Sequence, residues 1–189
     1  MHHLQIGSGI YTLKSELEDL GFKYLLPDEY NKIVMDLNKR KEHREEYLNN
    51  IKKQLLVYLK KERIKCDITG RTKHIYSIYK KLKRDNVTID QIYDIFALRI
   101  IVNDVATCYR ILGLLHEKFT PMMGRFKDYI AVPKSNNYQS IHTTIVGPLG
   151  KFIEIQIRTK DMDDIAEEGI AAHWNYKENK KSSKDDNIY

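Results

Sequence analysis

The stretch from Phe152 to Arg158 constrains the fold more than any other part of the sequence. It reads Phe-Ile-Glu-Ile-Gln-Ile-Arg, so apolar and polar side chains alternate strictly. Because successive side chains of a β-strand point to opposite faces, the pattern predicts a strand with isoleucines on one face and Glu154, Gln156 and Arg158 on the other. The isoleucines belong on a core. The polar face suits the floor of a polar site, and equally the solvated face of an antiparallel strand.

Composition bounds the class of protein. The chain has 189 residues, 42% hydrophobic and 31% charged, which is typical of one globular domain with helical additions. No apolar run approaches the roughly 18 residues that span a bilayer, and no signal-peptide pattern opens the chain, so no membrane association is expected. Cys66 and Cys108 lack disulfide or metal-ligand spacing, which favours a reducing, cytoplasmic setting. The net charge of +6 suits an anionic partner, either a nucleotide or a nucleic acid.

The first third of the chain has helical periodicity, and residues 1–64 are interpreted as an N-terminal helical segment. A short helix over 13–20 is expected to stop near Gly21, and Pro27 suits the first turn of a much longer helix. Apolar residues then recur at helical spacing as far as Leu59. Residues 38–46 are almost wholly charged, which predicts a break or an exposed stretch.

From residue 65 the sequence alternates between short elements. We predict strands over 66–68, 95–102, 139–146 and 152–158, and helices over 73–84, 105–118 and 160–176, with Asp104 as an N-cap. A loop over 120–137 and a turn over 147–150 separate the later elements. This order predicts an α+β or mixed α/β domain over 65–178, with a small sheet flanked by helices and a polar tail over 179–189.

The helix after Gly70 has a basic face opposite an apolar stripe. Lys73, Ser77 and Lys81 recur at every fourth position, so they align on one side and could bind phosphate oxygens through charges and a hydroxyl. The same face is also typical of an ordinary solvated basic helix. The glycine-lysine signature of a P-loop is absent.

One arginine and one acid fall on predicted strands, and a second acid directly precedes one of them. Arg99 lies inside a very apolar strand, where its charge needs a partner or a ligand because burying an unpaired charge is costly. Asp94 precedes that strand and Glu154 lies on another. Two carboxylates from different strands, completed by phosphate and water, are what magnesium prefers. The alternative is that Asp94 caps a turn and Arg99 pairs with an acid.

The loop after Gly124 carries the ingredients of a second nucleotide site. It presents Arg125, Lys127 and Lys134 around aromatic residues. A tyrosine can stack on a purine while amide and hydroxyl neighbours read its edge. The same residues suit a single-stranded RNA groove, and a lone histidine on a strand is more often structural than catalytic. The remaining candidates here are Asn136, Tyr138, Gln139 and His142.

Six motifs in order resemble the synthetase domain of the RelA/SpoT family, over about residues 65–178. They are Gly-Arg-Thr-Lys-His-Ile-Tyr-Ser-Ile-Tyr-Lys-Lys (70–81), Tyr-Asp-Ile-Phe-Ala-Leu-Arg (93–99), Gly-Arg-Phe-Lys-Asp-Tyr-Ile-Ala (124–131), Tyr-Gln-Ser-Ile-His-Thr-Thr (138–144), Glu-Ile-Gln-Ile-Arg-Thr (154–159) and Ala-Ala-His-Trp (171–174). The resemblance implies a nucleotidyltransferase-like fold. It also implies a GTP/GDP diphosphokinase that moves the β,γ-pyrophosphate of ATP to the 3′-hydroxyl of GDP or GTP, giving AMP and (p)ppGpp.

The resemblance also implies roles for individual residues. Arg71 and Arg99 would sandwich adenine, and Asp94 and Glu154 would bind Mg²⁺, with Glu154 taking the 3′-hydroxyl proton. Tyr138 would stack on guanine. The phosphate-binding residues would be Lys73, Ser77, Lys81, Lys127 and Lys134, and the further acceptor-side residues would be Asn136, Gln139, His142, Gln156 and Arg158.

One variable block bears on the acceptor. Arg125-Phe-Lys127-Asp128 has the basic Arg-x-Lys-Asp form of two-activity members, which by analogy favours GDP over GTP. No His-Asp dipeptide occurs in the chain, so hydrolase activity is not expected. Residues 10–30 resemble the linker after the hydrolase domain, which favours a domain excised from a longer protein over the alternative of a small standalone synthetase. Ribosome or RNA contact is then expected only through domains absent here, with no DNA partner.

Two other functions use the same residues. A binding module for RNA would need the arginines, lysines and tyrosines but not Glu154. A catalytically silent sensor would bind guanine nucleotide without turnover, and the presence of both Asp94 and Glu154 argues against it. The sequence leaves the oligomeric state open.

Overall fold

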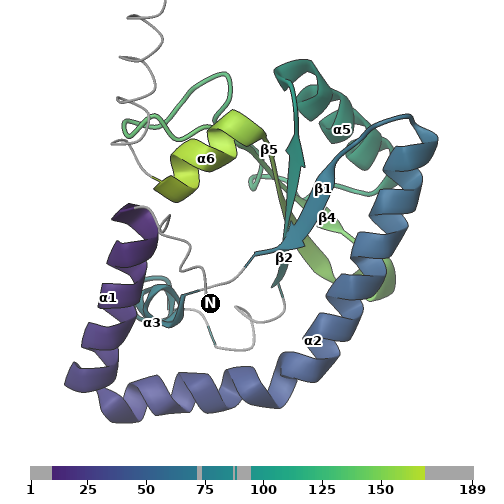
Figure 1. Cartoon of the computed structure of the whole chain (residues 1–189). Coiled ribbons are helices and arrows are strands. Elements are labelled where there is room, and N and C mark those ends of the chain that lie inside the picture. Colours follow the sequence, from purple (N-terminus) through teal and green to yellow (C-terminus); the bar gives the residue numbers. More distant parts are fainter. Residues whose placement is uncertain (1–9, 72–73, 87, 89–94, 169–189) are drawn as a thin grey trace, which may run out of the picture.

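The computed structural model describes residues 10–71, 74–86, 88 and 95–168. Within this part, β1 (Asp67–Gly70), β2 (Ile95–Val102), β3 (Lys127–Asp128), β4 (Ile141–Val146) and β5 (Phe152–Thr159) form one sheet in the order β1-β2-β5-β4-β3. The central pair, β2 and β5, is parallel, and the other pairs are antiparallel. The sheet is therefore mixed and has helices on its faces (Figure 1), which confirms the predicted α+β class.

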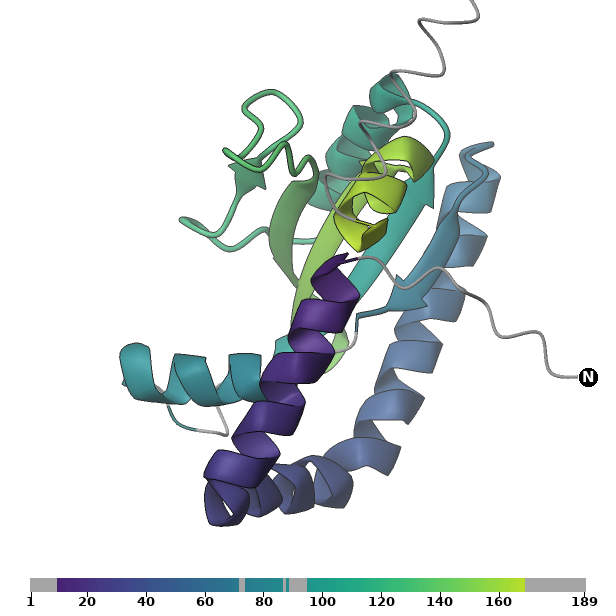
Figure 2. The same cartoon turned by 60° about the vertical axis from the view of Figure 1, so that its left-hand side comes forward.

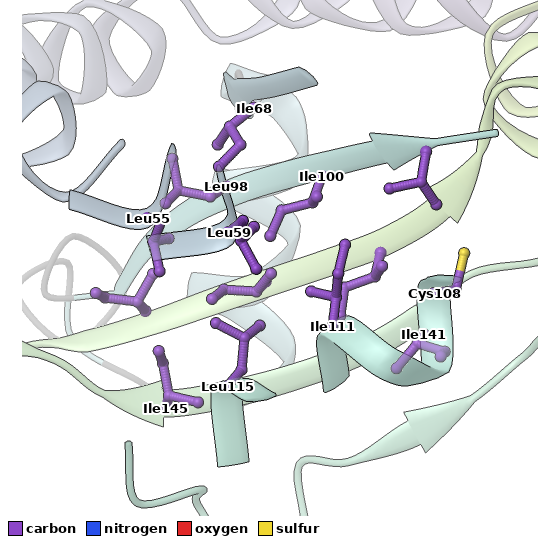
Figure 3. Packing of buried hydrophobic residues seen from close by; sticks show 14 of the residues in the cluster. Leu55, Leu59, Ile68, Leu98, Ile100, Cys108, Ile111, Leu115, Ile141 and Ile145 are labelled. Atoms are coloured by element: carbon purple, nitrogen blue, oxygen red, sulfur yellow. The ribbon is translucent and has the colours of Figure 1, made fainter. Parts of the chain in front are cut away.

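One face of the sheet lies on the main hydrophobic core. Ile153, Ile155 and Ile157 are fully buried there, as their alternation along the strand predicts. Helices α2 (Pro27–Lys61) and α5 (Val105–Lys118) cover this face, with Leu55 and Leu59 from the first and Ile111 and Leu115 from the second (Figure 3). Helix α6 (Lys160–Glu168) packs on β2 and β5 from the opposite side (Figure 1). The polar side of β5 thus faces away from the core.

The N-terminal helices differ from the prediction in extent. Helix α1 (Ile10–Leu25) runs through Gly21, so the predicted stop there was wrong. One internal glycine costs a helix only about 1 kcal/mol, and the next residue, Phe22, is buried in a second apolar cluster. Helix α2 begins with Pro27 in its first turn, as predicted, and continues for 35 residues. No helical break interrupts its charged middle, although the helix bends along its course (Figures 1 and 2).

Helix α3 (Ile75–Arg84) rests on these N-terminal helices. Its buried residue Ile78 packs with Phe22 and Ile33 in the second cluster, and Figure 2 shows α3 beside α1 and extending away from the sheet. The helix begins two residues later than the predicted Lys73, because His74 has the extended backbone of an N-cap. The side chain of Asp19 in α1 accepts a hydrogen bond from the Tyr76 amide at 2.8 Å. Helix α1 therefore fixes the start of α3.

The remaining elements follow the predicted order with shifted ends. Helix α5 matches its predicted bounds, and Asp104 caps it by accepting from the Thr107 amide at 2.8 Å. Strand β4 starts at Ile141, two residues after the predicted start, and β1 runs to Gly70 instead of ending at Ile68. The turn before β5 contains a short 3-10 helix, η1 (Pro148–Gly150). Helix α6 is the described part of the predicted 160–176 helix.

Candidate functional site

Strand register aligns four predicted site residues in one row across the polar face of the sheet. Arg99 on β2 is paired with Gln156 on β5, Gln156 with His142 on β4, and His142 with Lys127 on β3. Residues paired across a sheet project to the same face. The row therefore gathers residues that lie up to 57 positions apart in the chain.

Glu154 lies two residues before Gln156 on β5, so its side chain projects to the same face of the sheet. It is bound by Arg71. Its strand neighbours are Ala97 and Thr144. The Arg71 amide donates to the Ala97 carbonyl at 3.0 Å, which fixes the backbone just after β1. The Arg71 guanidinium then donates from Nη1 to Glu154 Oε1 at 2.7 Å. Neither side chain is buried, at 37% and 23% exposure, so this charged pair is open to incoming ligands.

Arg158 links helix α6 to the predicted guanine site. Its side chain is 1% exposed, and its Nε donates to Asp163 Oδ1 at 2.8 Å. The Arg158 Nη2 atom also lies 2.6 Å from the same oxygen as an ion pair, although the angle is not that of a hydrogen bond. From its other side, Arg158 Nη1 donates to Tyr138 Oη at 3.4 Å. A buried charge needs such partners, so Arg158 acts here as a fixed support beneath Tyr138.

His142 completes this chain of contacts as a neutral ring. The pKa of His142 is lowered from 6.5 to about 4, mainly by burial; the charge of Glu154 opposes this shift, and the charges of Arg71, Lys134 and Arg158 contribute to it. The Tyr138 hydroxyl lies 2.8 Å from His142 Nε2. Since Tyr138 already accepts from Arg158, its own proton is free to be donated to the unprotonated Nε2. Hydrogen bonds therefore connect Arg158 to Tyr138 and Tyr138 to His142.

Arg99 is bound by acids of α6. Its Nη1 donates to Glu167 Oε1 at 2.7 Å and lies 3.4 Å from Asp163 Oδ1. The Nε of Arg99 is buried without a hydrogen-bond partner among the described residues. The sequence predicted that this arginine needs a partner or a ligand, but it did not identify Asp163 and Glu167. Their spacing of four residues on a helix directly after β5 was the available signal.

The loop between β3 and β4 carries exposed cations around two aromatic rings. Lys134 Nζ lies 4.5 Å from the ring centre of Tyr129 and 5.2 Å from that of Tyr138. Asn136 Oδ1 accepts from the Tyr138 amide at 3.2 Å, and Gln139 Nε2 donates to the Ile130 carbonyl at 3.1 Å. Both amide side chains thus shape the loop. Arg125, two residues before β3, and Lys127, on β3 itself, are also exposed.

Ser77 and Lys81 are exposed on α3, which packs on α1 and α2. They are therefore positioned by the N-terminal helices. Lys73 and Asp94 lie outside the described residues. A separate cavity of about 410 Å³ at the turn between α2 and β1 is lined by Leu56, Lys60, Arg63, Ile64, Lys65 and Cys66, none of them a predicted site residue.

The described residues fit a magnesium ion only with help from a substrate. No group of three or more His, Cys, Asp or Glu among them could hold a metal ion by itself. Glu154 supplies one carboxylate, and its partly exposed oxygen atoms leave room for a further ligand. Mg²⁺ usually takes one or two protein carboxylates and completes its shell with phosphate and water, so this donor set fits.

As for membrane contact, no described helix is both long and apolar enough to cross a bilayer.

The comparisons with known proteins bear on the family to which these motifs belong. A family model described as the region found in RelA/SpoT proteins matches residues 70–181, more than half of the chain. The chain belongs to the RelA/SpoT family. The expected resemblance is thereby confirmed, and the matched region includes every predicted site residue.

Among curated relatives, a GTP pyrophosphokinase of Myxococcus xanthus is 52% identical over 94% of this chain and 24% of its own length. The bifunctional (p)ppGpp synthase/hydrolase SpoT of Escherichia coli is 47% identical over 93% of this chain and 25% of its own length. The chain thus spans about a quarter of these relatives. Other relatives are named as pyrophosphohydrolases, including one from Aquifex aeolicus at 46% identity, so the expected lack of hydrolase activity stays a prediction.

Solved structures confirm the expected fold. Small alarmone synthetase 1 from Bacillus subtilis, bound to its product pppGpp, aligns with a TM-score of 0.53 at 27% identity, covering 78% of this chain and 83% of that one. Small alarmone synthetase 2 from the same organism aligns with a TM-score of 0.55 at 25% identity, covering 82% of this chain and 84% of that one. This RelA/SpoT family member therefore has the sheet and helices of an alarmone synthetase.

Proposed function

We propose that this chain is a (p)ppGpp synthetase that transfers the β,γ-pyrophosphate of ATP to the 3′-hydroxyl of GDP or GTP. The observation that carries the proposal is the position of Glu154. It lies on the polar face of the central strand, 2.7 Å from Arg71 and beside the row formed by Arg99, Gln156 and His142. A carboxylate among fixed cations suits a reaction that depends on positioning and charge. An RNA-binding surface would not require it.

The ATP half would lie over β1, β2 and α3. Arg71 directly follows β1 and Arg99 lies on the neighbouring strand β2, and planar guanidinium groups can stack on both faces of an adenine ring. Ser77 and Lys81 on α3, with Lys73, would bind the phosphates. Lys127 and Lys134 would approach them from the opposite loop.

The acceptor half would lie over β4 and the loop before it. The ring of Tyr138 would stack on guanine, and the contacts from Arg158 and to His142 fix the orientation of that ring. Asn136 and Gln139 shape the same loop. A nucleotide bound there and ATP on the other half would meet at Glu154, which lies between the two.

The 3′-oxygen of the acceptor forms a bond to the β-phosphorus of ATP, the bond from that phosphorus to the bridging oxygen of AMP breaks, and AMP leaves with the electron pair. Glu154 takes the proton of the 3′-hydroxyl. Glu154 and Asp94 would hold Mg²⁺, and the bound ion would supply positive charge beside the transferred pyrophosphate. The cationic side chains orient the two nucleotides.

Three finer expectations belong to this proposal. The Arg125-to-Asp128 block is expected to favour GDP over GTP, and the chain is expected to lack hydrolase activity. We also expect the reaction to take place in the cytoplasm, where both nucleotides are available.

The experiment is a reaction of the purified chain with ATP, Mg²⁺ and either GDP or GTP, with the nucleotides separated by anion exchange. We expect AMP and a more highly charged guanosine product in equal amounts. Glu154→Gln is the matched negative control. Binding of guanine nucleotide without any product would favour the silent sensor. Salt-sensitive RNA affinity without nucleotide binding would instead favour the RNA module.

A further inference from the structure

Asp128, the last residue of the Arg125–Asp128 block, is half-buried, and its carboxylate bonds to the protein through both oxygen atoms. Its Oδ1 accepts hydrogen bonds from the amides of Ile130 at 3.0 Å and Ala131 at 2.9 Å. Its Oδ2 accepts from the Tyr109 hydroxyl at 2.8 Å. Both carboxylate oxygens therefore have protein partners. A carboxylate used in this way shapes a turn and is not aimed at an incoming nucleotide.

Tyr109 lies in α5, so its hydrogen bond to Asp128 connects this turn to that helix. Burial and the neighbouring Asp128 carboxylate both raise the pKa of Tyr109 above 10.0, so the hydroxyl keeps its proton and donates it. A second contact lies on the same helix, where the ring of His116 packs edge-on against Phe126 with 6.2 Å between ring centres. Helix α5 itself is anchored in the main core by Ile111 and Leu115. The acceptor block is thus tied to a rigid element at two points.

The turn at Asp128 leads directly to the predicted guanine-binding residues. The next residue, Tyr129, donates its amide to Ser140 at 2.9 Å, and its ring meets those of Tyr138 and His142 edge-on at 6.1 and 5.3 Å. The Ile130 carbonyl accepts from Gln139. A shift of the turn would therefore move Tyr138. By contrast, Arg125 and Lys127 are exposed and free to reach a nucleotide.

We propose that Tyr109 is a positioning residue for the guanosine acceptor and that it acts through Asp128. Asp128 anchors the loop between β3 and β4 without touching the nucleotide. Discrimination between acceptors then falls to the exposed cations of the block, Arg125 and Lys127. This proposal rests on the proposed synthetase function for its kinetic test, and its structural test is independent of activity.

The kinetic test compares the KM values for GDP and ATP in four variants of the chain. Tyr109→Phe is expected to raise the KM for GDP about three- to tenfold, as the loss of one partly exposed hydrogen bond to a charged group predicts, with the KM for ATP changed less than about twofold. Asp128→Ala is expected to raise the KM for GDP more than Asp128→Asn does, because the side-chain oxygen of asparagine can still accept from the amides of Ile130 and Ala131. Adding Tyr109→Phe to Asp128→Ala should cost nothing further, since residues that act as one unit are not additive.

Hydrogen exchange supplies the readout that does not need turnover. In Tyr109→Phe, the amides of Ile130 and Ala131 are expected to exchange at least about tenfold faster than in the unchanged chain. Tyr58→Phe is the matched control, because its hydroxyl also contacts α5, at the Leu114 carbonyl, away from the loop. Unchanged exchange at both amides in Tyr109→Phe would overturn the proposal even if the chain is an active synthetase. Equal increases in the KM values for ATP and GDP in Tyr109→Phe would also overturn the proposal. So would effects of Tyr109→Phe and Asp128→Ala on the KM for GDP that add up in the double variant.

Discussion

Arg71 and Glu154 bind each other across 83 positions of the chain, with 2.7 Å between Nη1 and Oε1. The family resemblance gives them separate ligands, adenine for the arginine and Mg²⁺ with the 3′-hydroxyl for the acid. In the folded chain each is the partner of the other. A change to either residue therefore alters the charge balance of the polar face.

Glu154→Gln is expected to remove turnover, by at least about a hundredfold, as typical for loss of a general base, while ATP binding stays within a few fold. The amide keeps an oxygen that can accept from Arg71, so the local structure is preserved. The measurement is AMP formation together with a direct ATP-binding titration. Glu62→Gln, at the distant end of α2, is the control. Normal turnover in Glu154→Gln would remove Glu154 from the reaction.

Tyr138→Ala is expected to raise the KM for GDP and leave that for ATP nearly unchanged. Loss of base stacking is worth about 1–3 kcal/mol, which corresponds to about a 5- to 150-fold change. Steady-state kinetics with each nucleotide varied in turn gives the answer. Tyr138→Phe keeps the ring and removes only the contacts to His142 and Arg158, so its effect should be smaller. Equal effects on both nucleotides would contradict a guanine-side role.

Replacing Arg125 by Glu and Lys127 by Asp together is expected to erode the preference for GDP over GTP. Both cations are exposed, so the exchange alters charge near the acceptor without disturbing the core. The ratio of kcat/KM for GDP and GTP is the quantity to measure. An unchanged ratio in the double variant would refute the selectivity role of this block.

The stability of the fold should depend on pH through His142. The folded chain lowers the pKa of this ring to about 4 from 6.5, so on acidification the unfolded chain takes up a proton that the folded chain does not. The contribution to stability is therefore complete above pH 6.5 and is lost as the pH falls towards 4, by about 2–3 kcal/mol. Urea unfolding between pH 7.5 and 4.5 measures it. His142→Gln should flatten this part of the profile, and an unaltered profile would exclude His142 as its source.

Asp19→Ala is expected to destabilise the chain by about 1 kcal/mol, the usual cost of losing a side-chain cap at a helix start. Asp19 accepts from the first-turn amide of Tyr76, and α3 carries Ser77 and Lys81. The Tm should fall and the KM for ATP should rise modestly. Glu16→Ala on the exposed side of α1 is the control. If both variants melt alike, Asp19 does not hold α3.

Much of the fold was predictable because local patterns decide it. The alternation along 152–158 gave a strand whose isoleucines are buried, and Asp104 capped α5 as its residue type suggested. Gly21 misled the prediction because burial of Phe22 outweighs the small cost of a glycine inside a helix. The late start of α3 depends on the backbone of His74, which no periodicity reveals.

The sequence by itself determined the family, the mixed sheet with its helices, and the residue types available for nucleotide chemistry. Those features reside in local periodicity and in ordered motifs. Only the tertiary structure decided which residues are partners: Arg71 with Glu154, Arg99 and Arg158 with the acids of α6, and Tyr109 with Asp128. These pairs join segments that strand register and helix packing bring together. A buried or half-buried charge must find some partner, but which partner is set by the three-dimensional path of the chain.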